Sequence, residues 1–149
     1  MLRKTHLVIG LVAGLYFLPH VNNKFIFLPI VLIASLFPDI DSGITSLGQK
    51  GIFRFLQMMT KHRGIMHTYT ICVILSLGLG LIFPPAALPF FLGYSFHLFA
   101  DSFTPQGIRP FWPLKAVSSG LVTTGSRFES IIFIVFSIIA VILFIALFI

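Results

Sequence analysis

The sequence predicts an all-α integral membrane protein: a single domain, residues 1–149, folded as a bundle of about five transmembrane helices. Of the 149 residues, 57% are hydrophobic, and the mean hydropathy is +1.04; both values are typical of membrane proteins. Long apolar runs alternate with Pro, Gly and polar residues, which commonly interrupt helices. The basic residues also divide unequally between the two sides that such a bundle would have.

The first apolar run follows a basic end, as in a secretory signal. No small-x-small cleavage site comes after it, so we expect a retained helix. The second run has roughly thirteen residues, whereas about twenty span the hydrocarbon layer. Pro38 ends this run, and Pro84 and Pro85 separate the third helix from the fourth. The expected helices are residues 3–18, 25–37, 65–83, 86–103 and 128–149, with polar loops at 39–64 and 104–126.

Charge predicts the orientation of the bundle. If the N-terminus is cytoplasmic, nine of the ten basic residues lie inside and only Lys24 lies outside, which is a clear positive-inside bias. The nine are Arg3, Lys4, Lys50, Arg54, Lys61, Arg63, Arg109, Lys115 and Arg127. The net charge of +6 does not indicate nucleic-acid binding, because these residues are spread through loops.

All four acidic residues stand near helix ends: Asp39, Asp41, Asp101 and Glu129. A carboxylate in or near lipid costs roughly 2.5–3.5 kcal/mol, so we expect these few to be functional. The charge-based orientation brings them to the cytoplasmic face together with every histidine except His20. The expected metal ligands are His6, Asp39, Asp41, His62, His67, His97 and Asp101.

The spacing favours shared ligation. His97 and Asp101 are four residues apart, which places them about 40° apart around a helix, so one ion or an adjacent pair can take both. His62 and His67 converge only if Gly64 breaks the helix. We expect His67 itself inside the third helix.

Asp39 and Asp41 point the same way if their stretch is extended. They follow the C-terminal end of a helix, where an anion opposes the helix dipole, so capping of that helix does not explain them. Nitrogen and carboxylate ligands from separate segments suit zinc, with manganese and iron as alternatives. An ion with open positions lowers the pKa of bound water and polarises a phosphoryl oxygen, which is the chemistry of hydrolysis.

Each residue also has a structural interpretation. His6 could lie at the membrane interface, His62 could be a loop residue, and His97 with Asp101 could be a neutral hydrogen-bonded pair. The two aspartates could cap the following segment. Glu129 could be the ion-pair partner of Arg63 or Arg127. We expect His20 to be a turn residue, Cys72 to be a packing residue, and Trp112 to anchor the membrane interface.

Four separated motifs resemble those of the YdjM-like family, in the same order: LFPDIDSGITSLGQ, HRGIMHT, LGYSFHLFADSFTPQGIRPFWP and TGSRFE. The resemblance runs from His6 to Glu129. That family is described as inner-membrane-associated metal-dependent hydrolases, some of them called LexA-binding. The resemblance implies a helical protein of the inner, cytoplasmic membrane of a prokaryote, with metal-dependent hydrolase activity.

A more distant pattern is similar to zinc-dependent phospholipase C and P1 nuclease. Carried over by position, it implies His6, one of Asp39 or Asp41, His67, His97 and Asp101 as ligands. The chain lacks the later His residues and the His-x-x-x-Glu helix of that group. We therefore expect one or two ions rather than three.

Together these observations predict a hydrolase that acts on a phosphoester of a lipid or polyprenyl carrier. The expected catalytic residues are Asp39, Asp41, Arg63 and Glu129. Arg63, Arg109 and Arg127 are expected to hold phosphate oxygens, because a guanidinium group binds phosphate in a bidentate way. One alternative is a non-catalytic scaffold with a structural metal, which binds a cytoplasmic protein through the 104–126 loop. A transporter is disfavoured by the lack of a polar path through the third and fifth helices.

Overall fold

The computed structural model describes residues 1–39 and 65–148. Its α-helices are α1 (Arg3–Phe17), α2 (Lys24–Ala34), α5 (Tyr69–Ile82), α6 (Pro84–Ser102) and α7 (Arg127–Phe148). Three short 3-10 turns accompany them: η1 (Leu18–His20), η2 (Phe37–Asp39) and η3 (Ile65–His67). The described part of the chain holds no strand, only an isolated bridge between Ile108 and Ser118. The all-α prediction is confirmed.

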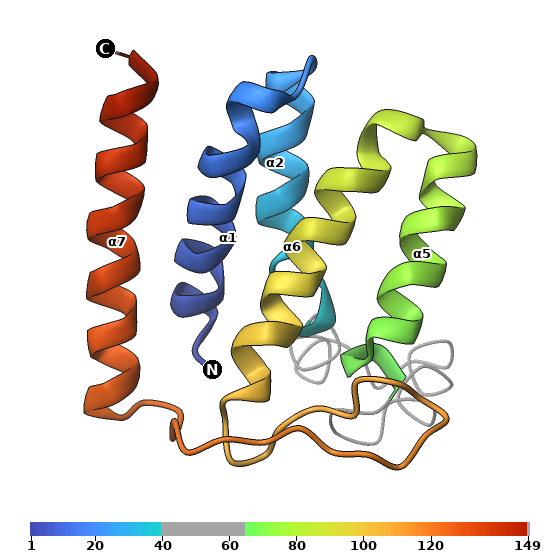
Figure 1. The fold of residues 1–149 in the computed structure, drawn as a ribbon, viewed down its shortest axis with the longest axis vertical. Coiled ribbons are helices and arrows are strands. Elements are labelled where there is room, and N and C mark those ends of the chain that lie inside the picture. Colours follow the sequence, from blue (N-terminus) through green and yellow to red (C-terminus); the bar gives the residue numbers. More distant parts are fainter. Residues whose placement is uncertain (40–64, 149) are drawn as a thin grey trace, which may run out of the picture.

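Successive helices run in opposite directions (Figure 1). α1 contacts α7, α6 and α2, and α6 also contacts α2 and α5. The C-terminal ends of α2 and α6 therefore lie at the same end of the bundle as the N-terminal ends of α1, α5 and α7 (Figure 1). We call this the lower end, as it is drawn in Figure 1. The segment between α6 and α7, residues 103–126, also runs along it.

The helix boundaries follow the prolines only in part, because Pro29 and Pro89 lie inside α2 and α6, and α2 ends at Ala34, before Pro38. Pro84 and Pro85 open α6, where their missing N–H groups are tolerated. α5 begins four residues later than expected, because Thr68 is its N-cap and accepts a hydrogen bond from the Ile71 amide. His67 therefore lies in η3, before the helix, and its expected place inside the helix is corrected.

Close approach of α6 to α2 depends on glycine. A Cβ atom added to Gly93 would lie 2.2 Å from the Val31 carbonyl oxygen, and one added to Gly10 of α1 would lie 2.6 Å from the Ser35 Cβ. Gly93 and Gly10 therefore let α6 and α1 both approach the end of α2 closely. A buried apolar cluster beside this contact includes Ala34, Tyr94 and Leu98.

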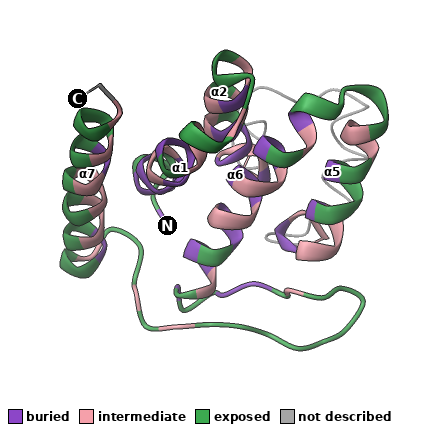
Figure 2. Cartoon of the chain, turned by 45° about the horizontal axis from the view of Figure 1, so that its top comes forward, coloured by how far each residue is buried: buried purple, intermediate pink, exposed green. Residues whose placement is uncertain are grey.

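α7 differs from the other helices. Its segment Arg127–Leu147 has 21 residues and a hydropathy of 3.2, and only 6% of its apolar window is buried. It is the one helix in the described chain long and apolar enough to cross a membrane; Tyr69–Ile82 is apolar but shorter. Figure 2 shows α7 largely exposed.

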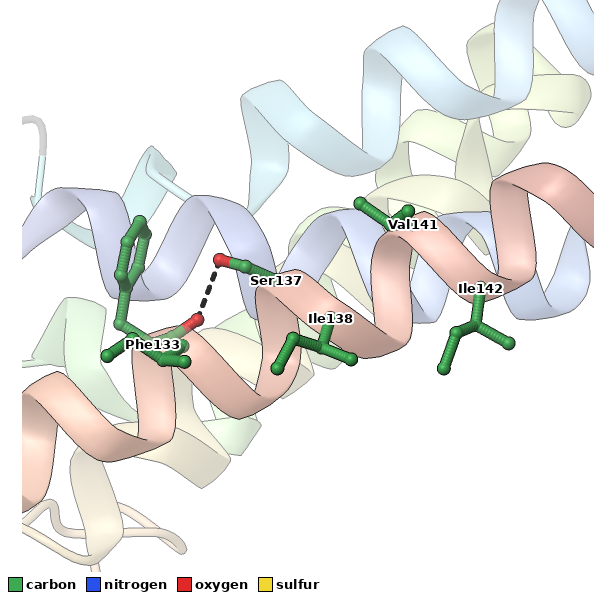
Figure 3. A pocket seen from close by; sticks show the side chains of 6 residues that line it. Phe133, Ser137, Ile138, Val141 and Ile142 are labelled. Carbon is green, nitrogen blue, oxygen red and sulfur yellow. Dashed lines mark hydrogen bonds between the residues drawn. The ribbon is translucent and has the colours of Figure 1, made fainter.

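The outer surface of α7 carries a shallow apolar pocket of about 330 Å³, lined by Phe133, Ile134, Ser137, Ile138, Val141 and Ile142. The single hydroxyl there, on Ser137, donates to the Phe133 carbonyl of its own helix (Figure 3). Because that hydroxyl is satisfied internally, the surface can face hydrocarbon without an unpaired polar group.

Candidate metal centre

Four side chains from three separate segments converge at the lower end of the bundle. Asp39 ends η2, His67 ends η3, and His97 and Asp101 occupy the last turns of α6. Each offers one ligand atom, and these four atoms all lie within 4.8 Å of one another. We call Asp39, His67, His97 and Asp101 the ligand group.

The distances within the ligand group suit a single ion. His67 Nε2 lies 3.4 Å from Asp39 Oδ1 and 3.8 Å from Asp101 Oδ2. His97 Nε2 lies 3.8 Å from each of the same two oxygens. Four donors held about 2.1 Å from a tetrahedral ion are roughly 3.4 Å apart. The ligand group is therefore only slightly wider than such a coordination shell.

Burial of the two histidines adds to this fit. His67 and His97 are 2% and 1% exposed, and within the described residues neither Nε2 atom has a hydrogen-bond partner. A buried polar atom without a partner costs free energy. An ion accepting both lone pairs would remove that cost, so the donor set fits a metal.

His97 is oriented by the end of α2. Its Nδ1 lies 2.8 Å from the Ser35 carbonyl oxygen, and Ser35 is the C-cap of α2, where carbonyl groups lack partners within the helix. An N–H at Nδ1 that donates to this oxygen leaves the Nε2 lone pair facing the two carboxylates. Metal-binding histidines commonly have such an outer partner.

His67 is fixed by the start of α5. The Thr68 hydroxyl donates to the Ile65 carbonyl oxygen at 2.7 Å and accepts from the Ile71 amide at 3.2 Å. These two bonds join η3 to the first turn of α5. They fix the backbone next to His67, which lies just before the helix and faces Asp39 and Asp101.

Asp39 forms the more accessible edge of the ligand group, since its side chain is 21% exposed while the other three are nearly inaccessible. Burial alone would raise its pKa, but His67, His97 and His6 outweigh that effect and hold the pKa of Asp39 below its ordinary 3.8. The carboxylate is therefore ionised near neutral pH. Asp39 itself lies in the 3-10 turn η2, while Asp41 lies outside the described residues.

His6 stands against the other side of Asp101. Its Nε2 lies 3.4 Å from Asp101 Oδ1, and its ring stacks on His97 with centroids 3.8 Å apart. Both His6 ring nitrogens are buried without a hydrogen-bond partner among the described residues. The Met1 amino group lies 2.7 Å from the same Oδ1. Asp101 thus faces the ligand group with one oxygen and His6 with the other.

Helix dipoles add to the electrostatics of the ligand group. Asp39 follows the C-terminal end of α2, and Asp101 lies in the last turn of α6. Both helix ends carry partial negative charge. The two carboxylates at these ends repel each other. A cation between them would be stabilised by both carboxylates and by both helix ends.

Glu129 lies apart from the ligand group. Its Oε1 accepts from the Leu2 amide at 2.6 Å, and its Oε2 accepts from the Gly125 amide. No ion pair with Arg127 forms in the described chain. Through these contacts Glu129 joins the starts of α1 and α7; the catalytic role expected from the sequence stays a prediction.

The other predicted site residues are distributed differently. Asp41, His62 and Arg63 lie outside the described residues. Arg109 and Arg127 are exposed, one in the 103–126 segment and one at the start of α7. His20 ends η1 at the opposite end of the bundle, and Cys72 is buried in α5, as expected for both.

Sequence reasoning missed Ser35 and Thr68 as supports of the site. Ser35 acts through a backbone carbonyl, which leaves no signal in residue type. Thr68 could have been found, because a Thr immediately before a long apolar run is a common N-cap signal.

Comparison with known protein families gives a match over the whole chain. The sequence model of the YdjM inner membrane protein family matches residues 1–149. No curated protein and no solved structure matches the chain. The whole-length match agrees with the order of the four sequence motifs and with the apolar surface of α7. The chain therefore belongs to the YdjM inner membrane protein family.

Proposed function

We propose that this protein is a membrane-bound, metal-dependent hydrolase that acts on a phosphoester of a lipid or polyprenyl carrier. The observation that carries the proposal is the ligand group: two buried imidazole nitrogens that have no hydrogen-bond partner among the described residues and that face two carboxylates at 3.4–3.8 Å. A divalent ion held there, zinc or else manganese or iron, would polarise a phosphoryl oxygen and activate water.

The residues have distinct roles in this proposal. His67, His97 and Asp101 are almost fully buried, so they hold the ion and keep its position fixed. Asp39 is ionised and more accessible, so it is the ligand or base nearest to an incoming substrate. Asp41 remains the other candidate for this role.

A second ion is part of the proposal. His6 and Oδ1 of Asp101 would be its first two ligands, since Oδ1 faces His6 while Oδ2 faces the ligand group; the ion would then replace the Met1 amino group at Oδ1. A carboxylate that uses both oxygens in this way can bridge two ions. The proposed count is therefore one or two ions for each chain.

The proposed membrane arrangement is a bundle of five spans with the N-terminus and the ligand group on the cytoplasmic side. Of the basic residues in the described chain, only Lys24 begins a helix at the upper end. The basic residues of the lower end are Arg3, Lys4, Arg109, Lys115 and Arg127. Arg109 and Arg127 are proposed to hold substrate phosphate oxygens, together with Arg63.

Elemental analysis of the detergent-purified protein tests the metal centre. Wild type should carry stoichiometric zinc, manganese or iron, and the His97→Ala/Asp101→Ala variant should lose it. His20→Ala is the matched control, because His20 is exposed at the opposite end. Absence of metal in the wild type, even after reconstitution with each ion, would rule out the metal centre.

Activity is tested separately on phospholipids and polyprenyl phosphates. If the protein is a hydrolase, the wild type should form product from one of these substrates. A chelator should abolish this activity, and His97→Ala should lack it. Hydrolysis that survives either treatment would contradict it.

A second candidate function is a non-catalytic scaffold with a structural metal, which binds a cytoplasmic protein. One observation favours it: the ligand group offers four protein donors, and structural zinc sites are closed by four protein ligands. Substitution with cobalt separates the two. If an open position exists, adding inorganic phosphate changes the visible spectrum of the cobalt protein, whereas a closed site leaves it unchanged.

A further inference from the structure

The segment that joins α6 to α7, residues 103–126, presents an unusual surface. We call it the α6–α7 loop. It runs along the lower end of the bundle (Figure 1), and Figure 2 shows it largely exposed. Its five exposed large apolar residues between Thr104 and Ser126 are Phe111, Trp112, Leu114, Val117 and Leu121, of which Leu121 is 95% exposed.

The backbone of the loop is held in place. Ile108 and Ser118 exchange two backbone hydrogen bonds, of 2.8 and 2.9 Å. The Tyr69 amide donates to the Pro110 carbonyl at 2.8 Å, and the Thr70 hydroxyl donates to the Trp112 carbonyl at 2.8 Å. The exposed apolar side chains therefore extend from a backbone that is held in place by hydrogen bonds. Five large apolar side chains exposed on one anchored segment make it a candidate interaction surface.

Charge identifies the partner. Residues 102–126 contain no Asp or Glu, and they include Arg109 and Lys115, both exposed. Exposed aromatic and aliphatic side chains interspersed with basic ones match an anionic lipid surface, where apolar groups enter the acyl boundary and cations contact phosphates.

The position of the α6–α7 loop next to α7 also supports a lipid partner. α7 begins at Arg127, immediately after the loop, and its apolar span starts there. The first turn of a spanning helix lies at the boundary between hydrocarbon and head groups. The end of the loop therefore lies at the same level as the bilayer surface.

We propose that the α6–α7 loop lies in the head-group layer of an anionic leaflet, with its apolar side chains inserted and with Arg109 and Lys115 on lipid phosphates. The ligand group at the same end of the bundle then opens toward lipid head groups instead of bulk water. This inference needs α7 in the bilayer; it does not need hydrolysis or a bound metal, so either can fail without the other.

The chain supplies its own reporter, because Trp112 is its only tryptophan. The full-length protein is placed in lipid nanodiscs of phosphatidylglycerol with phosphatidylcholine, or of phosphatidylcholine alone, each with or without brominated acyl chains. In the anionic discs, Trp112 fluorescence should be quenched by brominated lipid and protected from aqueous acrylamide. High salt should reverse both effects.

The variant Arg109→Gln/Lys115→Gln should weaken docking roughly fivefold for each charge removed. Lys24→Gln at the opposite end is the control and should quench like the wild type. Acrylamide quenching without lipid quenching would overturn the proposal and point to a water-facing protein contact. Lipid quenching that is equal in both lipids and unaffected by the double variant would overturn the role of anionic phosphates.

Discussion

Gly93 of α6 and Val31 of α2 are in such close contact that a Cβ atom on Gly93 would lie 2.2 Å from the Val31 carbonyl oxygen. One turn further along α6, His97 points its Nδ1 at the Ser35 carbonyl, also on α2. The separation of these two helices therefore sets the position of the His97 ring, and with it one side of the ligand group.

Gly93→Ala is expected to disturb the metal centre from a distance. The new methyl group meets backbone, which cannot move aside easily, so α6 must shift away from α2 at a cost of about 1–3 kcal/mol. Metal content should fall together with the melting temperature. Gly78→Ala is the matched control, because nothing lies within 4 Å of its added Cβ, and it should keep full metal occupancy. Full occupancy in Gly93→Ala would show that helix spacing does not position His97.

Thr68→Ala should weaken metal binding without touching the ion. The substitution removes the N-cap of α5 and the bond to Ile65, a loss of about 1 kcal/mol. We expect roughly fivefold weaker metal affinity, measured by competition with a chelating dye. Thr123→Ala, at an exposed loop position, serves as control. Equal metal affinity in Thr68→Ala and Thr123→Ala would show that the N-cap of α5 does not orient His67.

Glu129→Ala should lower stability and leave metal content intact. It deprives the Leu2 and Gly125 amides of their acceptor, and a hydrogen bond to a charged group contributes about 1.5–3 kcal/mol. Glu129→Gln keeps one acceptor oxygen, so its melting temperature should lie between those of the alanine variant and the wild type. Thermal unfolding in detergent measures the effect. Loss of metal from a variant that is still folded would show that Glu129 contributes to the metal centre.

Removal of the metal should destabilise the whole bundle. The ligand group joins the ends of α2 and α6 to the start of α5, so an ion held there acts as a cross-link between them. A ligand present at a thousand times its dissociation constant stabilises the folded state by about 4 kcal/mol. A chelator should therefore lower the melting temperature of the wild type and leave that of His97→Ala unchanged. Identical curves for wild type with and without chelator would argue that the four side chains form a metal-free polar cluster.

Much of this architecture could be predicted from the sequence. The apolar runs and the Pro84–Pro85 pair gave helix boundaries close to those observed, and strict alternation of helix direction was enough to bring His6, His67 and Asp101 to one end. The five-span arrangement in a membrane stays a prediction, since α7 alone has the required length and hydropathy in the described chain.

The rest depended on contacts that carry no residue signature. The orientation of His97 comes from a backbone carbonyl at a helix end, and the role of Glu129 comes from two backbone amides, one of them 127 positions away. A charge-based argument could pair Glu129 only with Arg63 or Arg127. Backbone amides occur at nearly every residue, so a charge-based argument could not identify them as the partners of Glu129.

The bond between Leu2 and Glu129 also has a consequence for biosynthesis. The first turn of α1 emerges early from the ribosome, yet the acceptor for its leading amide is made only when synthesis reaches α7. At ordinary translation rates this interval is on the order of ten seconds. A nascent chain halted before Arg127 would lack the acceptor of the Leu2 amide, so the starts of α1 and α7 are joined only late in synthesis.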